Sequence, residues 1–362
     1  MMDYNAIRRK SRKIMVGRVA VGGDAPIPVQ SMTNTDTHDV SATLAQVRRL
    51  EEAGCDIVRL AVPDRACAAT IAALKEAGVQ VPLVADIHFD YRIALACAEA
   101  GADKIRINPG NIGSPERVRE VVCACRERHI PIRIGVNGGS LEKHLLEKYG
   151  SPTPEALAES AMAHVRLLER FDFEDIIIAI KSSDPHTMME AVRLVAAQTD
   201  YPLHIGVTEA GTPHIGVLRS AIGIGGLLCS GIGDTIRVSL TADPVREVTE
   251  GRALLRAAGI FDRNEVSVNL ISCPTCGRTK IDLIPLAEAV EALILSGTLH
   301  PSRSVSVAVM GCAVNGPGEA READIGIAGG VGEALLFKKG EIVGKLPEQQ
   351  ILRVLRDEIN RM

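Results

Sequence analysis

Three cysteines near the C-terminus have the residue type and spacing of metal ligands. Cys273 and Cys276 form a C-x2-C pair in SCPTCGRTKIDL, and Cys312 lies in MGCAVNGPGEA. Tetrahedral zinc sites and iron–sulfur sites both need four ligands. No cysteine follows Cys312, and the chain has no second C-x2-C pair and no H-x3-H pair. The fourth ligand of this site is therefore not a sulfur.

The residues after Cys312 indicate a bulky inorganic cluster. The run from Asn315 to Gly318 reads NGPG, small and kinked residues that let a backbone wrap a cluster and bring N–H groups to its sulfides. Glu319 follows this turn directly. A carboxylate is a hard ligand on a soft iron, so its bond is expected to be exchangeable. Glu319 is the candidate for the fourth ligand.

A second set of polar residues ends successive apolar segments in the first two thirds of the chain. If these segments are parallel strands, their ends meet at one opening and gather several cations there. Such a charge is hard to keep unless an anion is bound, and arginine forks match phosphate oxygens. We therefore expect a phosphorylated, polyanionic substrate. The cations are Arg59, Arg106, Arg133, Lys181 and Arg237, and the same ends hold Gln30, Asp86, His88, Asn108, Asn137, Thr208, Glu209 and Ser239.

Two of these residues allow alternative roles. Glu209 either neutralises Arg237 or Lys181, or donates a proton, although neighbouring cations lower the pKa of a carboxyl and oppose that role. His88, in DIHFD, either hydrogen-bonds the substrate or is a satisfied core histidine.

The elements that position these residues alternate between short apolar strands and amphipathic helices. Eight such pairs in one stretch predict a TIM (β/α)8 barrel, and near-continuous apolar strands favour it over a doubly wound sheet. The predicted strands are 28–32, 56–61, 81–87, 104–108, 130–136, 175–181, 202–208 and 235–240. The predicted helices are 41–53, 65–77, 91–100, 115–128, 154–170, 186–198, 215–228 and 243–258.

The pattern changes near residue 260. Residues 1–260 are predicted to form the substrate-binding barrel, with KIMVGRVAVGG as a hairpin that plugs its bottom. Residues 261–362 are predicted to form a smaller α+β domain that carries all three ligand cysteines. Its expected helices cover roughly 283–296 and 347–361.

Composition excludes several classes of function. A net charge of −4, no Trp and few other aromatics argue against nucleic-acid binding. No apolar run is long enough to span a membrane and no signal peptide is visible, so we expect a cytoplasmic protein whose nine cysteines stay reduced. No G-x-G-x-x-G motif follows a strand and no Walker A motif is present, so dinucleotide and ATP binding are unsupported.

The motifs IRINPGN, GVNGGS, GVTEAG, SCPTCGR and GCAVNGPGE resemble those of the 4-hydroxy-3-methylbut-2-en-1-yl diphosphate synthase family of isoprenoid biosynthesis. The resemblance covers nearly the whole chain and fits the bacterial two-domain form. It implies reductive ring opening of 2-C-methyl-D-erythritol 2,4-cyclodiphosphate, with loss of water, and electrons from reduced flavodoxin or ferredoxin.

The resemblance also implies residue roles. A [4Fe–4S] cluster would be held by Cys273, Cys276, Cys312 and Glu319, with Asn315 near its substrate-facing iron. Glu209 would assist proton transfer. The substrate would be bound by Arg59, His88, Arg106, Arg133, Asn137, Lys181, Thr208, Arg237 and Ser239. Two alternatives stay open: a pterin-type or aldolase-type barrel with a structural zinc, and a non-catalytic iron–sulfur sensor.

Chain geometry predicts the assembly. A helix over 243–258 would return the chain to the bottom of the barrel, and residues 259–265 are too few to carry the second domain up to the barrel's own opening. We expect a head-to-tail homodimer in which one chain's barrel meets the other chain's cluster, and the resemblance points the same way.

Overall fold

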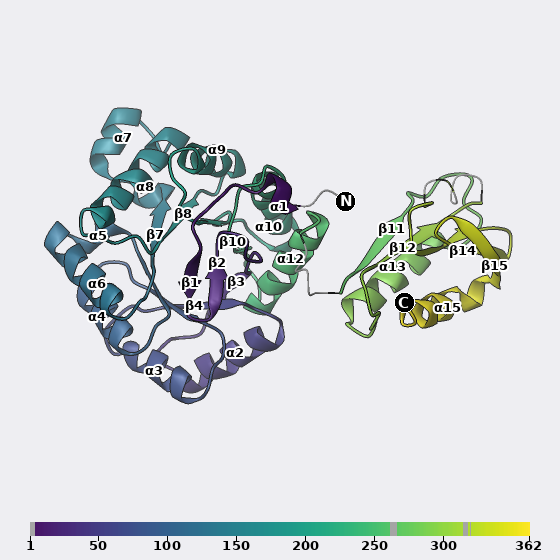
Figure 1. Cartoon of the computed structure of the whole chain (residues 1–362), viewed down its shortest axis with the longest axis horizontal. Helices are drawn as coiled ribbons and strands as arrows, with labels where there is room; N and C mark the ends of the chain where they lie inside the picture. The colour runs from purple at the N-terminus through teal and green to yellow at the C-terminus, as the bar shows by residue number, and fades with distance from the viewer. Residues whose placement is uncertain (1–3, 261–265, 314–317, 319) are drawn as a thin grey trace. The chain divides into compact units, whose positions relative to one another are not determined.

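The computed structural model describes residues 4–260, 266–313, 318 and 320–362. The chain divides into two compact units, residues 1–260 and residues 261–362, and each is described here by itself (Figure 1). Within the described residues, no helix is both long and apolar enough to cross a membrane.

The first unit is a parallel eight-stranded barrel surrounded by helices (Figure 1). Neighbouring strands pair in chain order, and a parallel bridge between Val29 and Ile236 links the first strand segment to the last. The predicted TIM barrel is therefore confirmed. The strands are β3 (Gln30–Met32), β4 (Ile57–Ala61), β5 (Leu83–Asp86), β6 (Lys104–Ile107), β7 (Ile132–Asn137), β8 (Ile176–Lys181), β9 (Leu203–Ile205) and β10 (Thr235–Ile236).

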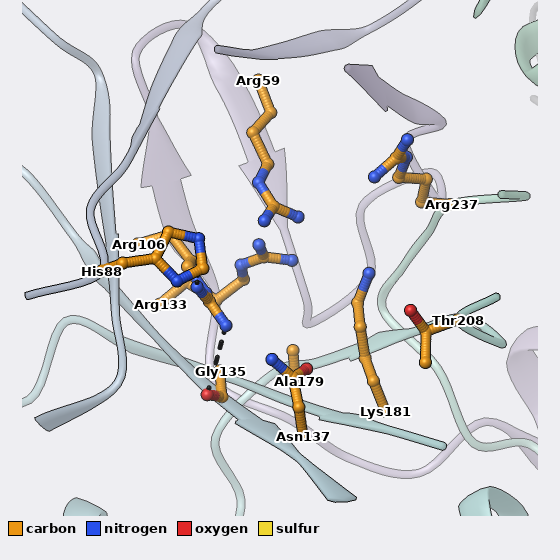
Figure 2. Close-up of a pocket in the computed structure, with 10 residues that line it drawn as sticks. All are labelled: Arg59, His88, Arg106, Arg133, Gly135, Asn137, Ala179, Lys181, Thr208 and Arg237. Atoms are coloured by element: carbon orange, nitrogen blue, oxygen red, sulfur yellow. Dashed lines mark hydrogen bonds between the residues drawn. The ribbon is translucent and has the colours of Figure 1, made fainter. Parts of the chain in front are cut away.

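The strands form because their sequences are apolar on both faces, as a sheet covered by helices requires. Every residue of β4 except Ala61, and every residue of β5, β6 and β8, is buried. The polar side chains at their carboxyl ends converge on one opening, which we call the mouth (Figure 2).

The outer helices begin at side-chain caps and end at glycines. Asp39, Thr153 and Asp184 each accept a backbone N–H of the helix that follows. Gly54, Gly78, Gly101 and Gly259 follow helix ends with φ between 72° and 89°, which favours glycine. The helices are α2 (Val40–Glu52), α3 (Ala68–Glu76), α4 (Tyr91–Glu99), α6 (Pro115–Glu127), α8 (Pro154–Glu169), α9 (Pro185–Ala196), α10 (Pro213–Ser220), α11 (Gly226–Cys229) and α12 (Pro244–Ala257).

One predicted helix differs in detail. The segment expected as a single helix over 215–228 consists of α10, a π-helical turn (Ala221–Gly225) and α11. A Cβ at Gly223 would lie 2.7 Å from Val207 Cγ2 and 2.8 Å from Met188 Cε. The turn is thus pressed against neighbouring elements at a point where only glycine fits, which periodicity does not reveal. Short helices also occupy loops: α1 (Tyr4–Ile7), α5 (Pro109–Ile112), a 3-10 turn (Gly138–Ser140) and α7 (Lys143–Tyr149).

The predicted N-terminal hairpin is present as β1 (Ile14–Val16) and β2 (Val19–Val21). Its side chains Ile14, Val16 and Val21 pack on buried barrel residues such as Ile57 and Ile177. The hairpin therefore adds to the apolar core of the barrel.

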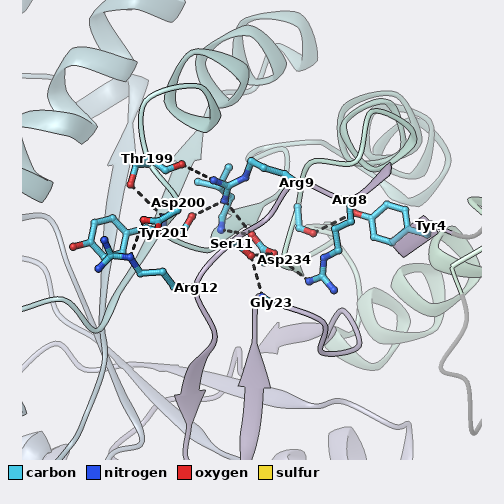
Figure 3. Close-up of polar contacts among 12 residues, drawn as sticks. Tyr4, Arg8, Arg9, Ser11, Arg12, Gly23, Thr199, Asp200, Tyr201 and Asp234 are labelled. Atoms are coloured by element: carbon cyan, nitrogen blue, oxygen red, sulfur yellow. Dashed lines mark hydrogen bonds and ion pairs between the residues drawn. The ribbon is translucent and has the colours of Figure 1, made fainter. Parts of the chain in front are cut away.

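One buried carboxylate anchors the segment that leads into this hairpin (Figure 3). Asp234 accepts hydrogen bonds from Ser11 Oγ at 2.7 Å, Arg8 Nη2 at 3.1 Å and Arg9 Nη2 at 3.4 Å. It also accepts the backbone N–H of Leu203 at 2.9 Å, at the start of β9. The carboxylate of Asp234 thus links the N-terminal segment to the barrel wall by hydrogen bonds and ion pairs.

Asp234→Asn is expected to lower the free energy of unfolding by about 3–5 kcal/mol, because it removes the charge partner of two largely buried arginines. The matched control is Asp200→Asn. Asp200 accepts from Arg12 Nε at 2.7 Å on the surface (Figure 3), where such a pair contributes at most about 1 kcal/mol. Urea unfolding followed by circular dichroism compares the two, and equal shifts would contradict the anchoring role.

The second unit is a five-stranded mixed sheet packed against two helices (Figure 1). The strands β11 (Val268–Ser272), β12 (Val305–Met310) and β13 (Ile325–Gly329) are parallel, and β14 (Glu333–Lys338) and β15 (Glu341–Pro347) continue the sheet antiparallel. The helices are α13 (Leu283–Leu295) and α15 (Ile351–Ile359), the latter preceded by a 3-10 turn (Glu348–Gln350). The predicted α+β domain is confirmed.

Candidate anion site and candidate metal-binding cysteines

The barrel mouth encloses a cavity of about 120 Å³, which we call the mouth pocket (Figure 2). Eight of the nine residues predicted to bind substrate line it, and Ser239 does not. The lining consists of Arg59, His88, Arg106, Arg133, Gly135, Asn137, Ala179, Lys181, Thr208 and Arg237.

One buried carboxylate, Asp86 at the end of β5, organises part of the pocket. It accepts hydrogen bonds from Arg59 Nη2 and, at 3.1 Å, from Arg106 Nη1. His88 Nε2 lies 3.3 Å from the same carboxylate. Burial alone would raise the pKa of Asp86, but Arg59, His88 and Arg106 outweigh it and hold the pKa well below its usual range. Asp86 thus remains ionised and orients two arginines.

Arg237 has its own carboxylate partner, so the sequence-based suggestion that Glu209 neutralises it is wrong. Glu247 of α12 is buried and accepts from Arg237 Nε and Nη2, both at 3.1 Å. It also accepts from Ser31 Oγ at 2.9 Å. Sequence reasoning gave no role to Asp86 and did not single out Glu247. Asp86 ends an apolar strand, a signal that could have found it, whereas Glu247 looks like any helix carboxylate.

Glu209 follows β9, is exposed and lies next to the pocket residue Thr208. Its φ of 51° is uncommon for a residue other than glycine. It forms no ion pair with another residue in the part of the chain that the structure describes, Lys181 included. Such backbone conformations cost free energy and often occur at functional sites, so a free carboxylate is held at the edge of the pocket.

Two cations of the pocket have no carboxylate. Arg133 is buried, and neither its Nε nor its Nη1 has a hydrogen-bond partner among the described residues. Lys181, which Figure 2 shows extending toward the same opening, likewise bonds to no other residue that the structure describes. Arg133 and Lys181 are therefore the cations of the pocket that have donors left for a bound anion and no carboxylate partner among the described residues, while Arg59 and Arg106 each keep a free Nε–H beside their bond to Asp86.

A glycine makes room for Arg106. A Cβ on Gly135 of β7 would lie 2.4 Å from Arg106 Nε and 2.7 Å from its Nη2. The guanidinium of Arg106 therefore lies against the bare backbone of β7, and its Nη2 is 3.4 Å from the Gly135 carbonyl oxygen (Figure 2).

Gly135→Ala is expected to displace Arg106 and to weaken binding of a diphosphate ligand at least tenfold, since about 1.5–3 kcal/mol is typical for a charged hydrogen bond. The control is Gly139→Ala. Gly139 lies in the 3-10 turn directly after β7, and an added Cβ there would meet nothing within 4 Å. Titration calorimetry measures both affinities. Equal affinity in the two variants would show that Arg106 does not contact the ligand.

The cysteines follow the ends of two adjacent parallel strands in the second unit. Cys273 directly follows β11, and Cys312 lies two residues beyond β12, whose Val309 is paired with Ser272. The backbone N–H of Gly311 donates to Cys273 Sγ at 3.2 Å. A backbone N–H hydrogen bond and the Arg278 side chain lower the pKa of the Cys276 thiol. These contacts favour thiolates, the form that binds metal.

The spacing of the sulfurs bears on the kind of metal group. Thiolates on a single zinc ion lie about 4 Å apart, because each Zn–S bond is about 2.3 Å. Among the described residues, the three cysteines do not form a group with ligand atoms within 4.8 Å of one another. The thiolate donors and their N–H contacts fit a larger iron–sulfur cluster. The NGPG run that follows Cys312 in the sequence indicates the same kind of group.

His38, Asp64 and Cys67 do form such a group, at the loops that follow β3 and β4. However, His38 Nδ1 lies 2.8 Å from Asp36 and Nε2 lies 2.8 Å from Asp64, so both ring nitrogens already have partners. We interpret this group as a polar link between two loops.

Two predicted site residues, Asn315 and Glu319, lie outside the described residues.

Comparison with known proteins covers both units. The family model described as the GcpE TIM-barrel domain matches residues 11–252, and the model described as the GcpE protein C-terminal domain matches residues 269–361. Together these matches span most of both units.

Similar proteins share one name. A 4-hydroxy-3-methylbut-2-en-1-yl diphosphate synthase (flavodoxin) from Clostridium perfringens is 58% identical over 348 residues, which are 96% of this chain and 97% of that protein. A protein of the same name from Caldanaerobacter subterraneus subsp. tengcongensis is 57% identical over 356 residues, 98% of each chain.

Two solved structures of low identity resemble part of this chain. A type I 3-dehydroquinate dehydratase from Clostridium difficile is 12% identical with a TM-score of 0.51, over 68% of this chain and 98% of its own. The Plasmodium falciparum HPPK-DHPS structure is 11% identical with a TM-score of 0.50, over 70% of this chain and 51% of its own. At these identities the likeness shows the fold and nothing about chemistry.

Proposed function

Since this chain belongs to the 4-hydroxy-3-methylbut-2-en-1-yl diphosphate synthase family, we propose that it converts 2-C-methyl-D-erythritol 2,4-cyclodiphosphate into 4-hydroxy-3-methylbut-2-enyl diphosphate. The observation that carries this proposal is near-full-length identity above half to synthases of that name. The reaction opens the ring, consumes two electrons and two protons and releases one water. Nothing in the comparisons supports the zinc-barrel or sensor alternatives.

The mouth pocket supports a diphosphate substrate. Arg133 and Lys181 have unused donors, and Asp86 holds Arg59 and Arg106 with their remaining N–H groups available. A guanidinium group can bind two phosphate oxygens at once, so these three arginines and Lys181 can together bind both phosphate groups of the substrate. His88, Asn137, Thr208 and Arg237 line the rest of the pocket and would orient the carbon chain, with Ser239 just beyond Arg237.

Cys273, Cys276, Cys312 and Glu319 would hold a [4Fe–4S] cluster, with Asn315 nearby. When bound, this group supplies electrons one at a time from a reduced donor, and the relatives' name indicates flavodoxin. The expected place of action is the cytoplasm, where reducing conditions keep cysteines available as ligands.

The protons of the reaction would be transferred by a residue of the barrel. Glu209 is exposed and unpaired among the described residues, so it can exchange its proton with solvent. It directly follows Thr208, which lines the mouth pocket. We assign it to proton transfer toward the leaving hydroxyl.

Lys181→Ala and Arg133→Ala are each expected to weaken substrate binding by roughly 1.5–3 kcal/mol, the typical value for a hydrogen bond to a charged group. The cluster's absorption spectrum should stay unchanged, because the cysteines belong to the other unit. Titration calorimetry and the spectrum are measured on the same samples. Unchanged affinity in both variants would mean that the anion binds elsewhere.

The function itself is tested with anaerobically purified protein. Iron and acid-labile sulfide analysis and the absorption spectrum establish the cluster, and mass spectrometry follows the product after addition of reduced flavodoxin. The expected result is a coloured protein that forms the linear diphosphate. A colourless, zinc-containing protein with no turnover would favour the alternative barrel enzyme instead.

We also propose that the active enzyme is a two-fold homodimer, arranged head to tail, with the barrel of one chain facing the cluster domain of its partner. Helix α12 starts beyond β10 at the mouth and leads away from it, and Ile260 is still packed against the barrel core. The chain therefore leaves the barrel far from the pocket. A partner's cluster domain is better placed to reach the pocket than the chain's own.

A further inference from the structure

The buried charges around the mouth pocket are not balanced. Asp86 is shared by Arg59 and Arg106, and Glu247 is taken by Arg237. Neither carboxylate bonds to Lys181, and no other described carboxylate does. Lys181 is only 8% exposed, so most of its side chain is removed from water.

The surroundings of Lys181 are cationic on almost every side. It is paired in register with Asn137 of β7, and Arg133 belongs to the same strand. Burial, followed by Arg59, Arg237, Arg133 and Arg106, lowers the pKa of Lys181 well below its ordinary value. Titratable and charged groups lie on every element around it. They are Arg59 of β4, Asp86 of β5 and His88 of the loop after it, Lys104 and Arg106 of β6, Arg133 of β7, His204 of β9, Glu209 of the loop after β9, Arg237 directly after β10, and Glu247 of α12.

Most of these groups cannot relieve the excess charge. The arginines keep their protons at any pH that the protein tolerates. Lys104 and His204 are fully buried and do not line the pocket, so a bound anion cannot become their partner. Lysine differs from arginine because its amine loses a proton readily when it is buried. Lys181 is therefore the cation of the pocket whose charge can follow occupancy.

We propose that Lys181 is an uncharged amine in the free enzyme and takes up one proton from solvent when the diphosphate enters, so that substrate binding is coupled to proton uptake. This inference depends on the proposed function for its ligand. The amine becomes an ammonium that donates to a phosphate oxygen, and no other bond is made or broken. The free pocket thereby avoids a fifth buried positive charge, and the occupied pocket gains it as a binding group.

A pH dependence follows with a definite sign. Binding raises the pKa of Lys181, so the protonated form is favoured in the complex. Affinity is then full below the pKa of the free enzyme and falls, by up to about tenfold per pH unit, until the pH reaches the pKa of the complex. The ligand adds no titration of its own near neutrality, because each phosphorus of a cyclic diphosphate carries a single, strongly acidic oxygen.

Calorimetry measures the uptake directly. The cyclodiphosphate is titrated into cluster-loaded, unreduced enzyme under anaerobic conditions at one pH, in buffers that differ in ionisation enthalpy. The dependence of the heat on buffer gives the number of protons taken up, and about one per site is expected. In Lys181→Arg the charge is fixed, so binding should persist with uptake near zero and with little pH dependence.

Control variants identify the group. Lys104→Met removes the other buried lysine, and His88→Gln removes the imidazole, whose Nε2 lies 3.3 Å from Asp86. Both are expected to retain an uptake of about one proton. If Lys181→Arg binds too weakly to measure, Lys181→Met at raised ligand concentration should bind without uptake.

The results that would contradict the role of Lys181 differ from the result that would contradict the proposed function. Binding without proton uptake by the wild-type enzyme, unaltered uptake in a Lys181 variant, or loss of uptake in His88→Gln or Lys104→Met would each overturn the role of Lys181. In all three cases the proposed function stands. If the cyclodiphosphate does not bind at all, the proposed function fails first, and the inference fails with it.

Discussion

Replacing Glu319 by cysteine is expected to leave an assembled cluster with only a small fraction of the turnover. In the proposed ligand set Glu319 is the single oxygen donor beside three thiolates. Thiolate is a softer ligand than carboxylate and binds iron more firmly. A fourth thiolate should therefore preserve or increase cluster content, while it blocks the exchange at the iron that the substrate needs. We expect a fall in the maximal rate of at least 100-fold, on the order of 3 kcal/mol in barrier.

Iron and sulfide content, the absorption spectrum and the rate with reduced flavodoxin are measured on one preparation. Glu322→Cys is the matched control, because Glu322 is an exposed carboxylate three positions further along the chain. It should keep both cluster and turnover. A fully active Glu319→Cys enzyme would sink the idea that this ligand must exchange, and a variant without any cluster would show that the site cannot accept a fourth sulfur.

The barrel was predictable because its signals are local and repeated. Each strand is a short apolar run followed by an amphipathic helix, as in Ile176–Lys181 and Pro185–Ala196, and eight repeats admit few folds. The errors lie where local sequence gives no signal. The π-helical turn at Ala221–Gly225 depends on how closely Gly223 approaches Val207 and Met188, which are distant in sequence.

Site residues were predictable when they share a position in the repeat. The arginines and Lys181 all lie within or just after apolar strands of one barrel, so a common opening follows from the fold. Their partners were harder to foresee. Glu247 lies in helix α12, and only the structure shows that its carboxylate accepts hydrogen bonds from Arg237, the residue after β10. One of the two alternatives given for Glu209, pairing with Arg237 or Lys181, is not observed among the described residues, and the uncompensated charge falls on Lys181.

The candidate ligand cysteines illustrate a different limit. Their adjacency follows from the parallel pairing of β11 and β12, which brings the end of one strand beside the end of the other. The spacing along the chain indicates ligands, but it cannot say which chain's substrate they serve. That question concerns assembly and requires an experiment on two chains.

Mixing two variants, Lys181→Ala and Cys312→Ser, is expected to restore activity if subunits exchange, when the substrate concentration is too low for Lys181→Ala alone to bind it. Each variant alone lacks one half of every active site. When the barrel of one chain works with the cluster domain of its partner, a hybrid dimer contains one site with both defects and one intact site. Random exchange makes half of the dimers hybrid, so about a quarter of the wild-type activity should appear.

The physical reason is the reach of the connection. Helix α12 has 14 residues, so it carries the chain roughly 21 Å away from the mouth at about 1.5 Å per residue. Seven residues separate Ile260 from β11, and even fully extended they span about 25 Å. That length scarcely returns to the level of the mouth, before any distance around the helices. If each chain nevertheless uses its own cluster, every site in the mixture keeps a defect, and the mixture stays inactive although its subunits exchange.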